Sequence, residues 1–247
     1  MMRNFKMLLA YDGSRYRGWQ RLGDSDRTIQ GKLEACLTAL LQQPVQISGA
    51  GRTDAGTHAM GQVASFRAET ALPAAQLLRQ LRARLPEDIG VLDLQEAAPR
   101  FHARLNAVGK TYRYRVWVSD QPCVFDRKYV YVCPGDYDLA AMRRAAQSLL
   151  GSHDFLAFSA NKPGKKSTVR QLDAISIEKT GEELVFTLTG DGFLHHMVRI
   201  LVGTLLEIGA GARPASSIAA IFASGCRADA GVTVPAQGLC LMEVQYH

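Results

Sequence analysis

This sequence of 247 residues lacks cysteine pairs. Its five cysteines are odd in number, widely spaced and without a Cys-x-x-Cys pair: Cys36, Cys123, Cys133, Cys226 and Cys240. This spacing argues against the disulfide framework of a small secreted domain and against a cysteine-based zinc site. We therefore expect reduced thiols and a cytoplasmic protein.

Long hydrophobic runs are also missing. The longest lies near residues 197–208, contains Arg199 and is shorter than the roughly 20 residues that span a bilayer. The first residues lead directly into an alternating strand-like pattern and contain no apolar region of signal-peptide length. We expect neither a membrane span nor a secretion signal.

Lysine is scarce relative to arginine. The sequence has 8 Lys and 21 Arg against 23 acidic residues, which gives a net charge of +6. The Arg guanidinium is planar and carries several N–H donors, so it can bind the oxygens of a phosphate and stack on bases. The positive net charge and the predominance of arginine weakly favour a nucleic-acid partner. The hydrophobic fraction of 47% and charged fraction of 21% are typical of an ordinary globular protein.

Two phosphate-binding motifs begin but are incomplete. Gly49-Ala50-Gly51 starts a Gly-x-Gly-x-x-Gly run, but Asp54 occupies its sixth place and no helical pattern follows. Gly109-Lys110-Thr111 matches the end of a P-loop, yet Arg104 stands where the first glycine is required. We therefore expect no dinucleotide site, and a P-loop is rejected.

His58, His195 and His196 are candidate metal ligands. We expect adjacent histidines on a helix to point to different faces, and no acidic partner lies at ligand spacing. We therefore expect no metal site. No Gly-x-Ser-x-Gly nucleophile motif is present.

Hydrophobic periodicity predicts two halves of mixed strands and helices, residues 1–105 and 106–247. In the first half, strands near 5–11, 45–47, 62–66 and 89–94 alternate with helices beginning near Thr28 and Pro73, an order typical of a ferredoxin-like unit. In the second half, strands are predicted near 107–118, 169–178, 183–189 and 239–244, and helices after Asp138, near 193–208 and near 217–222. A basic loop is predicted at 161–167.

Asp54 lies in a run of small residues, Gly49 to His58, between two strand-like segments. An Asp in such a loop often hydrogen-bonds its own turn. The alternative is a carboxylate presented for chemistry, because glycines let another chain approach closely.

The run Arg15 to Arg21 combines three arginines with Tyr16 and Trp19. Aromatic faces interleaved with Arg are typical of a surface for unpaired RNA. An ordinary loop with one buried Trp is an equal alternative.

Arg199 lies in an apolar helical pattern, three and four residues after His196 and His195. A buried unpaired Arg is costly, so Arg199 either extends to the surface or meets a carboxylate. Asp54 is the candidate partner. An ionised and positioned Asp can act as a nucleophile or base at a sugar carbon.

Together these residues resemble the tRNA pseudouridine synthase A family. The resemblance covers nearly the whole chain, in family order, through these segments: Tyr11–Ser14, Gly18–Gln20, Gly49–Val63, Phe101–Arg104, Lys110–Tyr114, Phe193–Arg199 and Pro235–Leu239. Departures from the family pattern are Thr57, Ser65 and Gln237, none of them at a predicted site residue.

The resemblance implies a cofactor-free isomerase that converts uridine to pseudouridine at positions 38, 39 and 40 of the tRNA anticodon stem-loop. Carried over by motif, Asp54 is the catalytic aspartate, Tyr112 stacks on the flipped-out uracil, Arg199 pairs with Asp54, and Arg52 displaces or holds the target nucleotide. The implied fold is α+β: two ferredoxin-like (RRM-like) halves joined in one largely antiparallel sheet with a central basic cleft, assembled as a homodimer. The alternative is a non-catalytic RNA-binding protein of the same fold. Such a protein would be expected to have lost Asp54 or Arg199, and this sequence keeps both.

Overall fold

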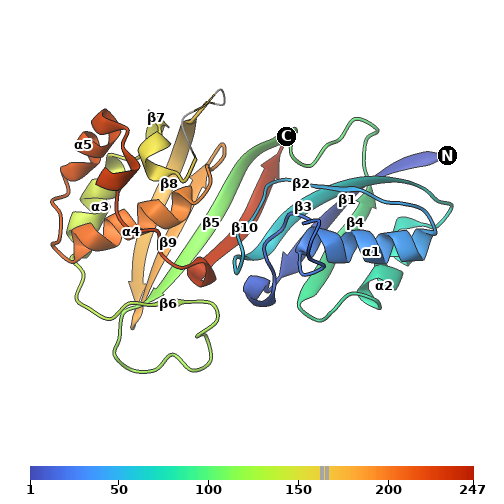
Figure 1. Cartoon of the computed structure of the whole chain (residues 1–247), viewed down its shortest axis with the longest axis horizontal. Coiled ribbons are helices and arrows are strands. Elements are labelled where there is room, and N and C mark those ends of the chain that lie inside the picture. Colours follow the sequence, from blue (N-terminus) through green and yellow to red (C-terminus); the bar gives the residue numbers. More distant parts are fainter. Residues whose placement is uncertain (162–163, 165–166) are drawn as a thin grey trace. The chain divides into compact units, whose positions relative to one another are not determined.

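The computed structural model describes residues 1–161, 164 and 167–247. Much of the predicted basic loop at 161–167 lies outside the described residues. The chain divides into two compact units, Met1–Val108 with Cys240–His247, and Gly109–Leu239 (Figure 1). The predicted division placed 106–247 in one half. The structure differs at the C-terminus because the last strand pairs with a strand of the first unit.

The first unit has the strand and helix order of a ferredoxin-like fold. Its elements are β1 (Met2–Tyr11), α1 (Ile29–Leu41), β2 (Ile47–Gly49), β3 (His58–Glu69), α2 (Ala74–Arg82), β4 (Ile89–Glu96) and β10 (Leu239–Tyr246). Strand β1 pairs antiparallel with β3 and β4, β2 pairs antiparallel with β3, and β10 runs parallel to the start of β3. Helices α1 and α2 cover one face of these strands (Figure 1).

The core of this unit follows from alternation along β1. Phe5, Met7 and Leu9 are fully buried and point to the helix-covered face, because successive strand residues alternate between faces. Leu33 and Leu37 of α1, and Leu77 and Leu81 of α2, are buried as well. Each such side chain contributes about 1.5–3 kcal/mol through burial.

The second unit is built from antiparallel strands with helices on one face (Figure 1). Its elements are β5 (Ala107–Trp117), β6 (Tyr131–Val132), α3 (Leu139–Gln147), β7 (Gly151–Asp154), β8 (Val169–Thr180), β9 (Glu183–Gly190), α4 (Met197–Gly209) and α5 (Ser217–Ser224). The strand order is β5-β9-β8-β7, and the short β6 runs parallel to β5. The α+β class and the largely antiparallel pairing are confirmed. No helix in the described ranges is long and apolar enough to cross a bilayer.

Helix α4 begins later than predicted. The sequence predicted a helix from about Phe193, but α4 starts at Met197 and His196 has a left-handed backbone with φ 61°. The carbonyl O of His195 accepts a hydrogen bond from Ala160 N at 3.0 Å, so it is engaged by a distant segment. The predicted helical spacing of His195 and His196 to Arg199 is therefore wrong.

Asp138 caps α3, as predicted: its side chain accepts a hydrogen bond from Ala141 N at 2.9 Å. We expect Asp138→Ala to lower the free energy of unfolding by about 1 kcal/mol, because a first-turn N–H loses its partner. Asp136→Ala removes an exposed carboxylate just before the helix and serves as the control. Urea unfolding followed by circular dichroism compares the two, and equal losses would contradict the capping role.

Candidate active site

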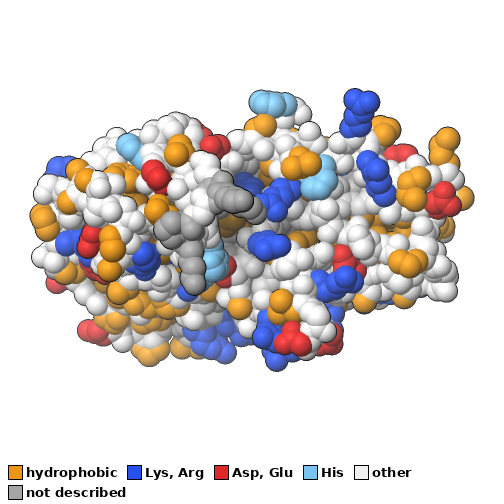
Figure 2. Space-filling view, turned by 45° about the horizontal axis from the view of Figure 1, so that its top comes forward, with side chains coloured by type: hydrophobic (Ala, Val, Ile, Leu, Met, Phe, Trp, Pro, Cys, Tyr) orange, Lys and Arg blue, Asp and Glu red, His pale blue; other side chains and the backbone are white. Residues whose placement is uncertain are grey.

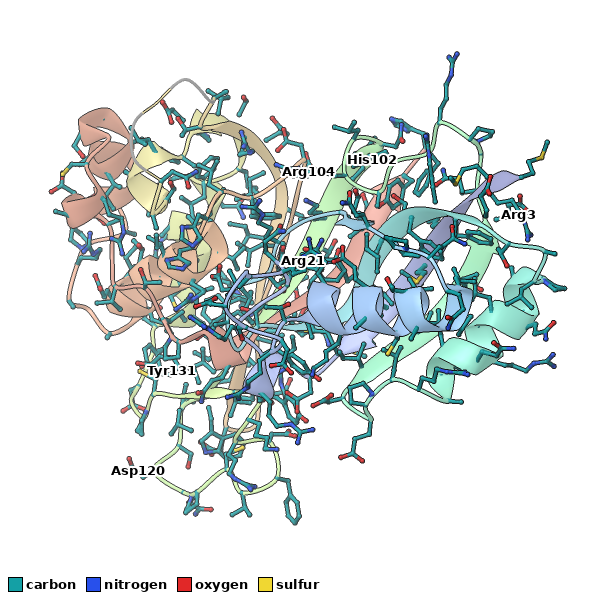
Figure 3. The ribbon with its side chains drawn as sticks, turned by 45° about the vertical axis from the view of Figure 1, so that its right-hand side comes forward. Arg3, Arg21, His102, Arg104, Asp120 and Tyr131 are labelled. Carbon is teal, nitrogen blue, oxygen red and sulfur yellow. The ribbon has the colours of Figure 1, made fainter. Side chains whose placement is uncertain are left out.

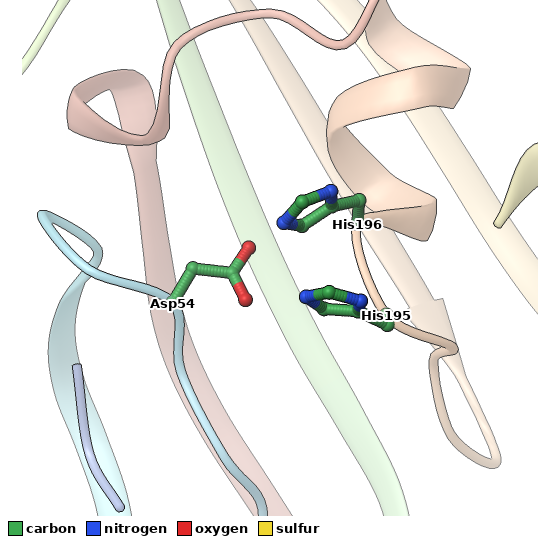
Figure 4. Close-up of side chains that lie close together, drawn as sticks. All are labelled: Asp54, His195 and His196. Carbon is green, nitrogen blue, oxygen red and sulfur yellow. The ribbon is translucent and has the colours of Figure 1, made fainter. Parts of the chain in front are cut away.

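Asp54 lies in the connection between β2 and β3, and backbone hydrogen bonds hold this connection on both sides. Ala50 N donates to Val63 O at 2.7 Å and Trp19 N to Thr53 O at 3.0 Å. Thr57 N donates to the backbone O of Asp54 at 3.1 Å, which closes a turn. The Asp54 side chain is half-exposed at the end of this fixed loop (Figure 4). The backbone around the carboxylate is thus positioned within the first unit alone.

Two glycines outside the loop let it lie close to the chain that follows β1. A methyl group at Gly13 would overlap the carbonyl O of Thr57. At Gly18, which has φ 93°, a methyl group would lie 2.6 Å from the carbonyl O of Thr53. These positions require glycine because the Asp54 loop rests directly on them.

A buried hydrogen-bond cluster supports the loop from below. The Tyr11 hydroxyl lies 2.9 Å from Thr53 Oγ1, and Gln62 Nε2 donates to Gly51 O at 3.0 Å. Burial raises the pKa of Tyr11 to about 12, although the hydrogen bonds to Thr53 and Gln62 act in the opposite direction. The phenol is therefore neutral at physiological pH and keeps this bond.

The aromatic side chains of the Arg15 to Arg21 run are buried. Trp19 is 2% exposed and packs against Gly49, where a methyl group would lie 2.5 Å from the indole ring. Tyr16 is also buried, and its hydroxyl donates to Asp88 Oδ1 at 2.6 Å. The interpretation that these rings form a stacking surface for RNA is wrong, and the alternative of a loop with a buried Trp is correct. The reason is that the Trp19 ring packs against Gly49 and the Tyr16 hydroxyl is held by Asp88, so neither ring lies at the surface.

The arginines of the same run stay at the surface, each beside an acid. Arg15 pairs with Asp88 at 2.6 Å, Arg17 with Asp24 at 3.5 Å and Arg21 with Glu34 of α1 at 3.2 Å. The Arg21 side chain is labelled in Figure 3. Lys and Arg side chains recur over the face drawn in Figure 2. Arg52, next to the loop turn, is exposed, and its Nε donates to Gln20 Oε1 at 2.9 Å.

Tyr112 lies on β5 of the second unit, in register with the buried Leu188 of β9. The Phe193 ring contacts the Tyr112 ring edge to face, with centroids 5.1 Å apart and planes at 82°. Tyr112 is 7% exposed and Phe193 is half-buried. Phe193 begins one of the segments quoted for the resemblance, but the sequence carried no signal that it contacts Tyr112.

Arg199, in the first turn of α4, is fixed by the chain that precedes β10. Its Nε donates to Val234 O at 2.7 Å, and the hydroxyl of Tyr114 donates to the next carbonyl, Pro235 O, at 2.6 Å. Burial raises the pKa of Tyr114, and the nearby positive charge of Arg199 partly opposes this shift. Arg199 is half-buried, and its Nε is held by a backbone carbonyl of the same unit.

His195 and His196 precede α4 with ring centroids 3.8 Å apart (Figure 4). The expectation that they point to different helix faces is wrong, because both residues precede α4: the helix begins at Met197, and His196 has a left-handed backbone.

The structure thus divides the predicted site residues between the units. Asp54 and Arg52 belong to the first, and Tyr112 and Arg199 to the second. The predicted pairing of Arg199 with Asp54 joins residues of different units and stays a prediction. Sequence reasoning missed the supporting roles of Tyr11, Thr53 and Gln62, although all three lie within segments that carry the resemblance.

Comparison with known proteins gave consistent matches over the chain. A family described as "tRNA pseudouridine synthase" matches residues 7–106 and 145–247. "tRNA pseudouridine synthase A 2" of Bacillus cereus (strain ZK / E33L) is 39% identical over 245 residues, which cover 99% of this chain and 100% of that protein. "tRNA pseudouridine synthase A" of Acetivibrio thermocellus is 41% identical with the same coverage. Among solved structures, a chain of an archaeal box H/ACA Nop10–Cbf5 complex aligns with a TM-score of only 0.38 and 14% identity, over 82% of this chain and 44% of that chain.

Proposed function

Because this chain belongs to the tRNA pseudouridine synthase family, we propose that it isomerises uridine to pseudouridine in the anticodon stem-loop of tRNA, at positions 38, 39 and 40. The observation that carries the proposal is the Asp54 loop. Its backbone is held by hydrogen bonds and by the close approach to Gly13 and Gly18, while the carboxylate is half-exposed. A rigid loop that presents one acid suits chemistry at a substrate atom.

The reaction exchanges one bond for another within a single nucleotide. The glycosidic bond from C1′ to N1 breaks, the uracil turns over, and C1′ bonds to C5. The C5 proton leaves and N1 gains a proton, so the product is an isomer. No oxidant, reductant or other cofactor is consumed. Asp54 engages the ribose–base unit as nucleophile or base, and either Asp54 or Tyr112 accepts the C5 proton.

The target uridine must leave its stem before Asp54 can reach it. Flipping costs a few kcal/mol, and stacking on Tyr112 returns about 1–3 kcal/mol. Because Tyr112 is 7% exposed, we expect its ring to be uncovered as the base enters. Arg52 displaces or holds the nucleotide, and contacts of this kind with phosphate weaken as salt increases.

Arg199 is the proposed partner that keeps Asp54 ionised. Its Nε is already engaged by Val234 O, which limits the rotation of the guanidinium. A guanidinium held in this way can meet a carboxylate with little further loss of side-chain freedom. Cytoplasmic location and homodimer formation are further parts of this proposal and depend on the family likeness.

Mapping of pseudouridine in tRNA tests the proposed function. Unmodified tRNA transcripts with uridine at 38, 39 or 40 are incubated with the purified chain, and the modified positions are mapped by chemical labelling and reverse transcription. We expect conversion at one or more of these positions. A transcript with cytidine at all three is the control. Binding of tRNA without any conversion would contradict the proposal and favour the non-catalytic alternative.

A further inference from the structure

We propose that Phe193 is a positioning residue for the reaction: it holds the ring of Tyr112 in the orientation that stacks on the target base. This inference rests on the proposed function and adds a residue to which the family likeness assigned no role. All the contacts that carry it lie within the second unit.

The contact between the two rings has a directional geometry. Ring centroids lie 5.1 Å apart with planes at 82°, so the edge of one ring meets the face of the other. The partial positive charge of a ring edge favours this arrangement over a face-to-face sandwich. Such a contact restricts ring rotation about χ2, which a contact with an aliphatic side chain does less well.

The backbone of Tyr112 is fixed by the sheet, which leaves the orientation of its ring to its neighbours. Strand β5 pairs with β9 on both sides of Tyr112, and Thr111 Oγ1 lies 3.0 Å from Thr189 Oγ1. These bonds set where the side chain begins. They do not set the angle of the ring, and Phe193 contacts the ring itself.

Phe193 is presented by a turn that is fixed at both ends. Gln171 and Asp191 exchange two hydrogen bonds: Asp191 N donates to Gln171 O at 3.1 Å, and Gln171 N donates to Asp191 Oδ1 at 3.0 Å. At the other end, Ala160 N donates to His195 O at 3.0 Å. A non-glycine residue with left-handed backbone, His196, then leads into α4. Because the turn is held at both ends, it can fix the position of the Phe193 ring.

The first test is the single-turnover rate of pseudouridine formation at saturating enzyme. We expect Phe193→Ala and Phe193→Leu to lower this rate about 3- to 10-fold, the range of an aromatic edge-to-face contact, and Phe193→Tyr to restore most of it. A role in packing alone would let Leu substitute as well as Tyr. Equal rates for the Leu and Tyr variants would overturn the proposal.

The second test asks whether Phe193 acts through Tyr112. All variants are made in an Asp54→Asn background, so that the bound tRNA stays unreacted. For each variant, the affinity for intact tRNA is divided by the affinity for the same tRNA with an abasic target site. This ratio measures base-specific binding. We expect Phe193→Ala to reduce this ratio and to have no further effect once Tyr112→Ala is present. If Phe193→Ala lowered this ratio by the same factor with and without Tyr112→Ala, the proposal would be overturned.

Phe222→Ala is the matched control. Phe222 contacts Phe155 and Phe158 in an aromatic cluster of the same unit, with centroids 5.4 and 5.2 Å apart. We expect it to lower thermal stability without changing the base-specific ratio. If the unsubstituted chain forms no pseudouridine, the proposed function fails, whereas the binding comparison still decides the role of Phe193.

Discussion

We expect Asp54→Asn to abolish pseudouridine formation, with a loss of roughly 10³-fold or more, and to leave tRNA affinity within a few-fold of the unsubstituted chain. Asn has nearly the same shape, so the steric fit of the loop is retained. It has no negative charge, so it can act neither as a nucleophile at the sugar nor as a base. Tritium release from C5-labelled uridine in tRNA measures the reaction, and filter binding measures affinity.

Asp93→Asn is the control for this substitution. Asp93 is exposed on β4 of the same unit, so the change in net charge is equal and only the position differs. We expect normal tritium release from this variant. Release that continues in Asp54→Asn would show that another group carries the chemistry, and the assignment of Asp54 would be abandoned.

We expect Gly13→Ala to reduce both stability and activity. The added methyl group overlaps the backbone of Thr57, which cannot move aside as a flexible side chain could. Overpacking of this kind costs typically 1–3 kcal/mol of unfolding free energy. The loop that carries Asp54 must also shift, and a displacement of about 1 Å at a reacting group can lower the rate 10²-fold.

Gly23→Ala separates this effect from a general cost of replacing glycine. Gly23 lies in the same connection after β1, and a methyl group there would meet nothing within 4 Å. We expect a change in thermal midpoint of less than about 1 °C for Gly23→Ala and several degrees for Gly13→Ala, with a loss of rate only in the latter. Similar results for the two variants would mean that Gly13 does not support the Asp54 loop.

The burial of two aromatic rings changes the interpretation of the segment between β1 and α1. The sequence left two equal alternatives for Arg15 to Arg21, a surface that presents aromatic rings to RNA and an ordinary loop with a buried Trp. In the structure, Tyr16 and Trp19 are buried, and Gly13 and Gly18 receive the Asp54 loop. The segment is therefore a support for the loop, with its arginines at the surface.

Much of the secondary structure could be predicted because its signals are local. Alternation along β1 and β5, helical spacing in α1, and the Asp138 cap of α3 each depend on residues a few positions apart. The Asp54 loop was also identifiable, since its glycines and its flanking strands are adjacent in the sequence.

The errors lie where distant segments meet. The start of α4 was misplaced because Ala160 engages the carbonyl of His195 and Gln171 engages Asp191, partners 35 and 20 residues away. The last strand, which the sequence placed in the second half, is grouped with the first unit, and its parallel pairing with β3 leaves no trace in its own residues.

By itself, the sequence determined the α+β class, the family likeness and the residue types available for chemistry, because composition, periodicity and motif spacing are properties of the chain alone. Only the tertiary structure decided that Trp19 is buried beneath the Asp54 loop and that Phe193 contacts the ring of Tyr112. The physical reason is that burial and ring contact depend on backbone hydrogen bonds and close packing between segments far apart in sequence. No local pattern specifies those contacts.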